Sequence, residues 1–320
     1  MGKIIKGYKG FDQNLNCRGF QYEVGGEYEH EGEVDCCESG FHFCEYPLDV
    51  FGYYPPASSR YCEVEGTGKI DRDNGDSKVA CSKLKVKAEI GLIELIKSGI
   101  KFILDRVDWK NASEFNTGHR SVATNTKHSS ATINNGDQSA AINAGCQSTA
   151  INTGDKSAAI NDGYQSTAIN TGYRSAAISN RGQSAAINAG YQSAAINTGD
   201  QSAAINNGGH SAAINTGYRS TAINTGFLSA AVNNGGQSAA INIGPYSAAI
   251  VEGWESVAMA IGYKSKAKGA LGCWLVLAEW DDEGTYIIDV QCRKVDGENI
   301  KADTWYQLIG GEFKEVEVKP

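Results

Sequence analysis

Polar and apolar positions alternate with a fixed nine-residue period through the middle of the chain. From Gly118 to Ala270 the unit Gly-x-x-Ser-Ala-Ala-Ile-Asn-x repeats 17 times without a gap. Serine occupies the fourth position of every unit, and glycine occupies the first position of 15. The run Ser-Ala-Ala-Ile-Asn predicts a short strand, and the glycine predicts a corner that uses positive φ angles. Units this short bury a face only by stacking, so we predict a mainly β chain with a parallel β-solenoid.

The variable second position of the unit bears on the number of strands in one coil. Its residues separate best at a period of 27, in rows such as Tyr164, Tyr191, Tyr218 and Tyr173, Asp200, Phe227, Trp254. This period favours a three-sided coil, made of three units, over a two-sided coil made of two. Duplication of a three-unit gene segment would produce the same period of 27 in the sequence, so a two-sided coil remains an alternative.

Strand alternation divides each unit between two faces. The fourth, sixth and eighth positions (Ser, Ala, Asn) point one way, and the fifth and seventh (Ala or Thr, and Ile) point the other. If the small residues line a thin interior, an isoleucine stripe lies outside and needs a covering chain. If isoleucine fills the interior, the Ser/Ala/Asn surface is flat and free to pack. The asparagines are expected to bond to one another in a ladder along the stack. Both arrangements indicate self-association, as a trimer or a dimer.

The repeat is flanked by segments of ordinary composition. Residues 1–88 predict an α+β domain, and residues 89–117 contain apolar positions at helical spacing, which indicates a helix that caps the first coil. Residues 118–270 are the solenoid. Residues 271–320 contain four short apolar runs separated by turns, which predicts a C-terminal β-meander cap. Caps are expected because an open solenoid end would template aggregation.

Charge and hydropathy narrow the possible partners. The 320 residues carry a net charge of −8, which argues against binding nucleic acid by broad phosphate neutralisation. No run reaches the length of a membrane span, and the N-terminal residues lack the apolar core of a signal peptide. We therefore expect a cytoplasmic protein with no membrane contact.

The last repeats carry a resemblance to a known class of β-roll. The stretch from Glu255 to Ala270 (ESVAMAIGYKSKAKGA) resembles the heads of trimeric autotransporter adhesins. That resemblance implies parallel strands that pack within and between chains, and an adhesin-like role is one alternative function. The repeats of those heads are longer than nine residues, so the resemblance supports the solenoid and a trimer more than adhesion.

The flanking segments carry a second resemblance. The motifs YKGF from Tyr8, CRGFQY from Cys17, GFHFC from Gly40 and PLDV from Pro47, with GCWL from Gly272, look like an uncharacterised domain of Firmicute and prophage proteins. This resemblance implies a phage or bacterial cytoplasmic origin and carries no activity.

The N-terminal domain also has a likeness to ADP-ribosyltransferases. It rests on Tyr8-Lys9-Gly10, on Gly40-Phe41-His42-Phe43 and on Tyr53-Tyr54. The likeness implies an NAD contact, a stacking tyrosine and a catalytic glutamate at Glu63, Glu65 or Glu89. We hold this enzyme as the alternative function and predict no catalytic residue.

The cysteines of the N-terminal domain are candidate metal ligands, but their spacing along the chain does not favour a metal site. Cys36, Cys37, His42 and Cys44 would have to gather, yet no Cys-x-x-Cys pair occurs. Free buried thiols are the better interpretation, so we predict neither a metal nor a cofactor. Calcium is disfavoured because the second position holds no fixed aspartate, and ice binding would need the serines to face outward.

Corner residues of the solenoid are the predicted binding surface. They are aromatic side chains at the second position with two adjacent arginines: Tyr164, Tyr173, Tyr191, Tyr218, Phe227, Trp254, Arg174 and Arg219. Exposed aromatic rings suit protein recognition, and stacking that stiffens the corner is the competing interpretation. We predict a non-enzymatic interaction or scaffold protein, phage- or prophage-encoded, that binds a host or virion protein. Inhibition of a host defence is one form that this role would take.

Overall fold

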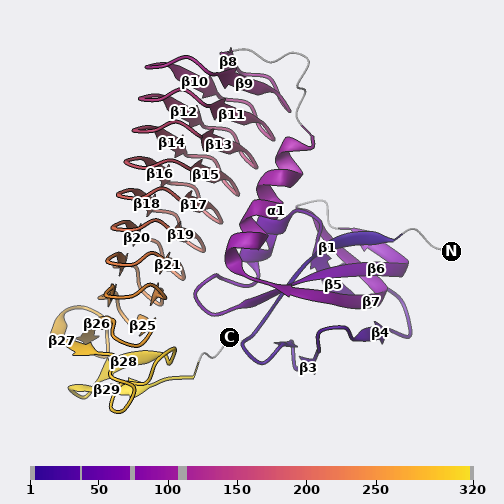
Figure 1. Cartoon of the computed structure of the whole chain (residues 1–320). Helices are drawn as coiled ribbons and strands as arrows, with labels where there is room; N and C mark the ends of the chain where they lie inside the picture. The colour runs from indigo at the N-terminus through magenta and orange to yellow at the C-terminus, as the bar shows by residue number, and fades with distance from the viewer. Residues whose placement is uncertain (1–3, 37, 73–75, 107–113, 318–320) are drawn as a thin grey trace. The chain divides into compact units, whose positions relative to one another are not determined.

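The computed structural model describes residues 4–36, 38–72, 76–106 and 114–317 (Figure 1). The chain divides into two compact units, one that extends through Phe102 and one that runs from Ile103 to Glu317. The fold is mainly β, as predicted, with a parallel solenoid that follows the N-terminal domain in sequence and precedes the C-terminal strands.

The N-terminal unit is built on a five-stranded sheet that surrounds a hydrophobic core. Its elements are β1 (Ile5–Phe11), β2 (Asn16–Cys17), β3 (Phe20–Gln21), β4 (Glu27–Glu29), β5 (Phe41–Cys44), the 3₁₀ helix η1 (Pro47–Gly52), β6 (Arg60–Arg72) and β7 (Lys78–Ile90). The sheet order is β4-β7-β5-β1-β6, and β6 also pairs with β7. Strands β7, β5, β1 and β6 therefore form a closed ring of pairings around Phe11, Phe43 and Val64.

One α-helix follows the last strand of this unit. Helix α1 (Leu92–Leu104) runs unbroken through Gly99, where a methyl group would lie 2.9 Å from Leu48 Cγ. The Phe102 ring lies 5.2 Å from the Tyr46 ring, so the helix contacts η1 and the segment before it. Its predicted role as a cap on the first coil stays a prediction, and Val107 and Trp109 lie outside the described residues.

Every repeat forms one strand, at the fifth to eighth positions of the unit. The strands after β8 (Phe115–Asn116) are β9 (Val122–Asn125), β10 (Ala131–Asn134), β11 (Ala140–Asn143), β12 (Thr149–Asn152), β13 (Ala158–Asn161), β14 (Thr167–Asn170), β15 (Ala176–Ser179), β16 (Ala185–Asn188), β17 (Ala194–Asn197), β18 (Ala203–Asn206), β19 (Ala212–Asn215), β20 (Thr221–Asn224), β21 (Ala230–Asn233), β22 (Ala239–Asn242), β23 (Ala248–Val251), β24 (Val257–Ala260) and β25 (Lys266–Gly269).

The coil has two sides, so the favoured three-sided coil is wrong. Each strand pairs in parallel register with the strand two repeats further on, for example Ile151 with Ile169. From β8 to β26 the even-numbered strands make one sheet, the even sheet, and from β9 to β25 the odd-numbered strands make the other, the odd sheet. The interior between them holds only Ser, Ala and Asn over most of its length, and alanines such as Ala168 and Ala177 are fully buried. Side chains this small let two sheets meet directly and leave no space for a third side.

Asparagine joins the two sheets instead of forming the expected Asn–Asn ladder. Asn152 Nδ2 donates to the carbonyl oxygens of Ser139 and Ala158, which belong to the preceding and following repeats, at 3.3 and 3.2 Å. Its Oδ1 accepts from the Gly154 amide at 2.8 Å. The vertical ladder is made by serine, since the Ser157 amide donates to Ser175 Oγ at 3.0 Å. These bonds satisfy polar groups that the thin interior shuts away from water.

The corner glycines serve close packing and not a positive φ angle, which corrects the sequence-based prediction. A methyl group on Gly154 would lie 2.0 Å from the Gly136 carbonyl oxygen in the adjacent coil. The positive φ angles, from 51° to 56°, fall on the third position of each unit, as at Gln138. There the Gln138 amide donates to the Asp155 carbonyl of the next coil at 2.8 Å.

The C-terminal strands close the two sheets of the solenoid separately. Strand β26 (Trp274–Trp280) adds to the even sheet in parallel, and β27 (Ile287–Lys294) then pairs with it antiparallel. Strand β28 (Tyr306–Ile309) ends the odd sheet by pairing antiparallel with β25, and β29 (Glu312–Glu315) follows. The predicted β cap is therefore present, with its strands divided between both sheets.

Candidate functional site

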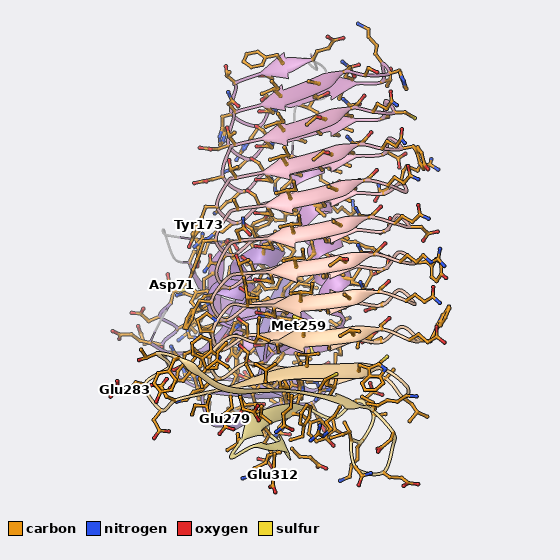
Figure 2. All side chains as sticks on the ribbon, turned by 90° about the vertical axis from the view of Figure 1, so that its left-hand side faces the viewer. Asp71, Tyr173, Met259, Glu279, Glu283 and Glu312 are labelled. Atoms are coloured by element: carbon orange, nitrogen blue, oxygen red, sulfur yellow. The ribbon has the colours of Figure 1, made fainter. Side chains whose placement is uncertain are left out.

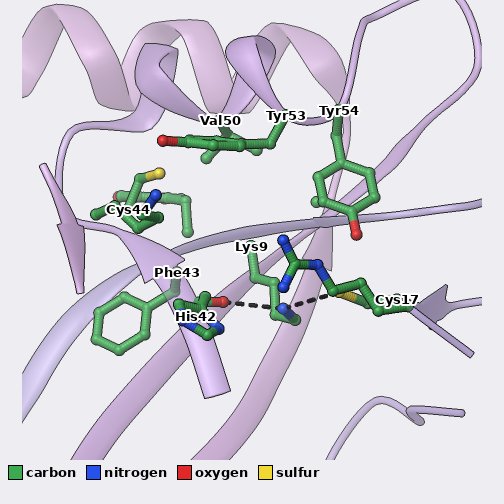
Figure 3. A pocket seen from close by; sticks show the side chains of 12 residues that line it. Lys9, Cys17, His42, Phe43, Cys44, Val50, Tyr53 and Tyr54 are labelled. Carbon is green, nitrogen blue, oxygen red and sulfur yellow. Dashed lines mark hydrogen bonds between the residues drawn. The ribbon is translucent and has the colours of Figure 1, made fainter. Parts of the chain in front are cut away.

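A pocket of about 270 Å³ opens in the N-terminal unit where β1 and β5 separate. The two strands share a single residue pair, Tyr8 with Cys44. Beyond that pair the two strands diverge, and side chains occupy the space between their backbones. Twelve residues line the pocket: Tyr8, Lys9, Gly10, Cys17, Arg18, His42, Phe43, Cys44, Val50, Tyr53, Tyr54 and Lys78 (Figure 3).

Lys9 bridges the gap between the two diverging strands. Its side chain is 4% exposed, and Nζ donates to the His42 carbonyl at 2.9 Å and to Cys17 Sγ at 3.3 Å. The rings of Phe11 and Tyr22 lie 5.5 and 5.2 Å from Nζ. A buried ammonium is stable only with such contacts, so the local structure holds a positive charge at the base of the pocket.

Two further cations come from different parts of the fold. Arg18 and Gly19 form the tip of the β2–β3 hairpin with positive φ angles of 51° and 78°. Lys78 begins β7 and lies 4.9 Å from the Tyr53 ring. Burial lowers the pKa of His42, and the charges of Lys9, Arg18 and Lys78 lower it further. A neutral histidine therefore lies in a field that favours anions.

Tyrosines form the opposite wall. Tyr53 and Tyr54 follow η1; Tyr54 extends toward the side of Lys9, whereas the Tyr53 ring runs past Val50 toward Cys44 (Figure 3). The Tyr53 hydroxyl donates to Asp76 at 2.5 Å, and burial followed by this hydrogen bond raises its pKa. Burial also raises the pKa of Tyr54, whose ring packs on Gly10. Both phenols are therefore neutral. Each supplies a ring to the wall, and the hydroxyl hydrogen of Tyr53 is already donated to Asp76.

The structure brings together the segments that carry the ADP-ribosyltransferase likeness, but it leaves the candidate glutamates outside. Tyr8 to Gly10, His42, Phe43, Tyr53 and Tyr54 all line the pocket. Glu89 forms an ion pair with Arg60 at 2.6 Å, Glu65 pairs with Lys87, and Glu63 is exposed on β6. The described lining residues include no carboxylate. Sequence reasoning missed Arg18 and Lys78, because only the strand pairing brings them to Lys9.

The cysteines do not form a metal centre in the described part of the chain. Cys44, Cys62, Cys81 and Cys273 are buried free thiols, and burial raises the pKa of Cys62 and Cys81 to about 11. Cys37 lies outside the described residues. Among those described, no group of three or more His, Cys, Asp or Glu side chains is placed to hold a metal ion.

The predicted aromatic rows do not exist in space, because one coil consists of two repeats and not three. Tyr173, Tyr191 and Phe227 lie at the corner before the odd strands, whereas Tyr164, Tyr218 and Trp254 lie at the opposite corner. The first corner carries a continuous column of ring contacts through Tyr173, Tyr191, His210, Phe227, Tyr246, Tyr263 and Trp280. Sequence reasoning missed His210 and Tyr246, because they occupy the third position and it followed only the rings at the second.

The two predicted arginines support the rings beside them. The Arg174 guanidinium lies 4.9 Å from the Tyr173 ring and donates to Gln192 at 2.9 Å. Arg219 lies 5.1 Å from the Tyr218 ring and donates to Gln237. At this corner the Tyr218 and Trp254 rings are 5.9 Å apart, across Gly236, where a methyl group would collide with Trp254. These contacts are the ones expected if the aromatic side chains stiffen both corners.

The outer face of the even sheet is an apolar surface. Its seventh positions form one column in register, the apolar column: Ile133, Ile151, Ile169, Ile187, Ile205, Ile223, Ile241, Met259 and Val276. All nine side chains are half-buried, and Met259 lies near the C-terminal end of this face in Figure 2. The serines point inward and are buried, so the outward hydroxyl ladder that ice binding required is not there.

Comparison with known proteins finds a family match within the N-terminal unit, and the match carries no activity. Residues 5–98 match a family described as a domain of unknown function (DUF7666). No curated protein and no solved structure gives a significant match. The described residues contain no helix whose length and hydropathy would let it cross a bilayer.

Proposed function

We propose that this chain is a non-enzymatic interaction protein whose solenoid binds a protein partner through the outer face of the even sheet. The observation that carries the proposal is the apolar column. Strands β10 to β26 of this sheet place two outward residues each on the face, and every one of these residues is uncharged. Contiguous apolar surface of this kind marks protein interaction sites.

The partner that fits this face best is a second copy of the chain. Strands in any sheet are about 4.8 Å apart. The rows of side chains on one solenoid therefore have the same spacing as the grooves between rows on a second solenoid, along the whole length of the face. Nine strands of four residues give a face of roughly 38 by 13 Å. Two such faces would bury about 1,000 Å², which reaches the size of a specific interface. A two-fold pair uses the same patch on both copies.

The outward residues at the C-terminal ends of the two sheets differ, and the difference favours the even sheet as the interface. On the even sheet the apolar surface continues onto β27, where Val290 pairs with Ala278 and is 51% exposed. On the odd sheet the last outward positions are Lys266 and Lys268. Charged residues at such positions oppose association. On the even sheet an outward charge, Lys294, pairs with Trp274 but lies on β27, beyond the nine strands of the apolar column. The even sheet therefore supports an interface better than the odd sheet does.

Sedimentation velocity tests the proposal with a charge placed in the apolar column. In Ile205→Lys, two like charges would face one another across the interface, and the dimer constant should weaken at least ~10-fold. Gln201→Lys adds the same charge at the exposed corner of the same repeat and should leave association unchanged. Circular dichroism checks that both variants keep the fold. A wild-type chain that is monomeric at ~100 μM, or equal association of both variants, would contradict the proposal.

We propose further that the chain also binds a bacterial or phage protein. This proposal is supported by the sequence resemblance to prophage proteins. A host or virion protein that binds the wild-type chain but not Ile205→Lys would support it, and binding that is indifferent to this substitution would argue against it.

A further inference from the structure

The N-terminal pocket concentrates positive charge next to aromatic rings. Lys9, Arg18 and Lys78 all line it, and the described lining residues include no carboxylate. Two acidic side chains, Asp49 and Asp76, lie outside the lining but close enough to act on the wall of the pocket. Three cations in the lining therefore outnumber the acidic groups behind it, and the pocket keeps a net attraction for an anion.

The charge at the base of the pocket is built into the fold. Lys9 is buried, and the partners that the structure gives its ammonium are neutral: the His42 carbonyl, the Cys17 sulfur and the rings of Phe11 and Tyr22. Burying an ammonium without a carboxylate is costly. The fold retains this cation at the point where β1 and β5 diverge, and a bound anion would compensate it.

The opposite wall favours a planar group. Tyr54 extends toward the side of Lys9, and the Tyr53 ring lies along the same wall toward Cys44 (Figure 3). Tyr53 is 47% exposed although its ring is apolar, and Lys78 Nζ lies 4.9 Å from that ring. Rings presented this way stack on flat ligands. The volume of about 270 Å³ lies just below the usual range for small-molecule sites. It therefore suits one ring system and one anionic group.

We propose that this pocket binds a small ligand that joins a planar ring to an anionic group, with the chemistry of a nucleoside monophosphate. Lys9, Arg18 and Lys78 hold the phosphate, and Tyr53 and Tyr54 contact the base. The site lies in the N-terminal unit, so the inference goes beyond the solenoid interface and does not depend on it.

Calorimetry on the full chain at low salt tests the inference with AMP and UMP as probes. Each nucleotide should bind at micromolar concentration, whereas adenosine and ribose 5-phosphate should each bind at least ~10-fold more weakly, because each lacks one of the two groups. Failure of both nucleotides to bind at ~1 mM, or equal affinity for adenosine and AMP, would overturn the proposal.

Matched variants locate the ligand. Arg18→Asn removes the charge while asparagine tolerates the positive φ of the hairpin tip, and it should weaken AMP at least ~10-fold. Tyr53→Ala should weaken AMP, whereas Tyr53→Phe keeps the ring and should not. Lys97→Ala, which removes an exposed cation on α1, should have no effect. Unchanged AMP affinity in both Arg18→Asn and Tyr53→Ala would place the nucleotide elsewhere and overturn the assignment.

Discussion

A methyl group on Gly190 would lie 1.9 Å from the carbonyl oxygen of Gly172, which belongs to the adjacent coil of the solenoid. Such a distance is far inside van der Waals contact. The same relation recurs at the other corner, as between Gly163 and Gly145. The separation of the stacked backbones therefore favours glycine at the first position of the repeat, where Lys127 and Arg181 are the two exceptions.

Gly190→Ala should destabilise the solenoid strongly. The new methyl group has to displace backbone, not a flexible side chain, and overpacking of this kind costs about 1–3 kcal/mol or more. Gly182→Ala is the matched control, because its methyl group would lie 3.3 Å from the nearest atoms, and the free energy of unfolding should change by less than ~0.5 kcal/mol. Urea unfolding followed by circular dichroism measures both. Equal midpoints for the two variants would refute the close-packing role.

The strand position within each repeat could be predicted from the sequence, but the number of sides could not. The run Ser-Ala-Ala-Ile-Asn placed the strands at positions four to eight, and the structure has them at positions five to eight. The period of 27 was misleading because 27 residues span one and a half coils, so residues such as Tyr164 and Tyr191 lie at opposite corners. One coil is 18 residues, and at that separation Tyr164 lies against Gly182 and Tyr191 against Gly209, whereas Tyr173 stacks on Tyr191. The uniformly small interior was the signal for two sides.

Two substitutions at the eighth position of the repeat should change stability in opposite directions: serine in place of asparagine should destabilise the chain, and asparagine in place of serine should stabilise it. Asn188 Nδ2 donates to Ser175 and Ala194 carbonyls at 3.1 and 3.0 Å, and its Oδ1 accepts from the Gly190 amide. Asn188→Ser removes these bonds inside the protein and should cost about 2–4 kcal/mol, since each buried unsatisfied group costs about 1–3 kcal/mol.

Ser179 occupies the same position in another repeat, and its buried Oγ has no hydrogen-bond partner. Ser179→Asn restores the repeat's usual bonds and should stabilise the chain by about 1 kcal/mol. Thermal unfolding of both variants against the wild type gives the signs. A loss of stability in Ser179→Asn would show that Arg181, which replaces glycine in that corner, has changed the local geometry.

The ring column should contribute to stability without any partner present. Tyr191 stacks on Tyr173 with centroids 5.6 Å apart and planes 11° apart, and it lies 5.0 Å from the His210 ring. Tyr191→Ala removes both contacts and should cost about 1–2 kcal/mol, whereas Tyr191→Phe keeps the rings and should be close to neutral. Chemical denaturation distinguishes the two. If Tyr191→Ala were as stable as the wild type, recognition and not stiffening would be the role of these side chains.

The N-terminal pocket was only partly foreseeable. Local motifs identified Lys9, His42 and Tyr53, because short patterns carry them. Arg18 has a positive φ angle at a hairpin tip, and Lys78 begins a strand much further along the chain. Their approach to Lys9 depends on the way β7, β5 and β1 pair, which no local pattern encodes.

Lys266 should make stability depend on pH above neutrality. It occupies an outward position of the last repeat, with Nζ 5.0 Å from the Trp305 ring, and burial lowers its pKa from 10.5 to about 8. Between pH 8 and 10.5 the unfolded chain therefore binds more protons at this residue than the folded chain does. The free energy of unfolding should rise with pH in that window, by at most about 1.4 kcal/mol per unit, and the contribution should be constant below pH 8.

Two substitutions of Lys266 separate the titration from the packing. Lys266→Met removes the buried charge, so it should be more stable than the wild type at pH 7, and this advantage should shrink as the pH rises to 9.5. Lys266→Arg stays charged across the range, so it should show neither the gain at pH 7 nor the wild-type rise. Urea unfolding at pH 7, 8, 9 and 9.5 gives the differences directly, because other titrating groups cancel between variants. A wild-type slope that Lys266→Met retains would mean that other groups titrate in this window and that the Lys266 ammonium is better solvated than its burial implies.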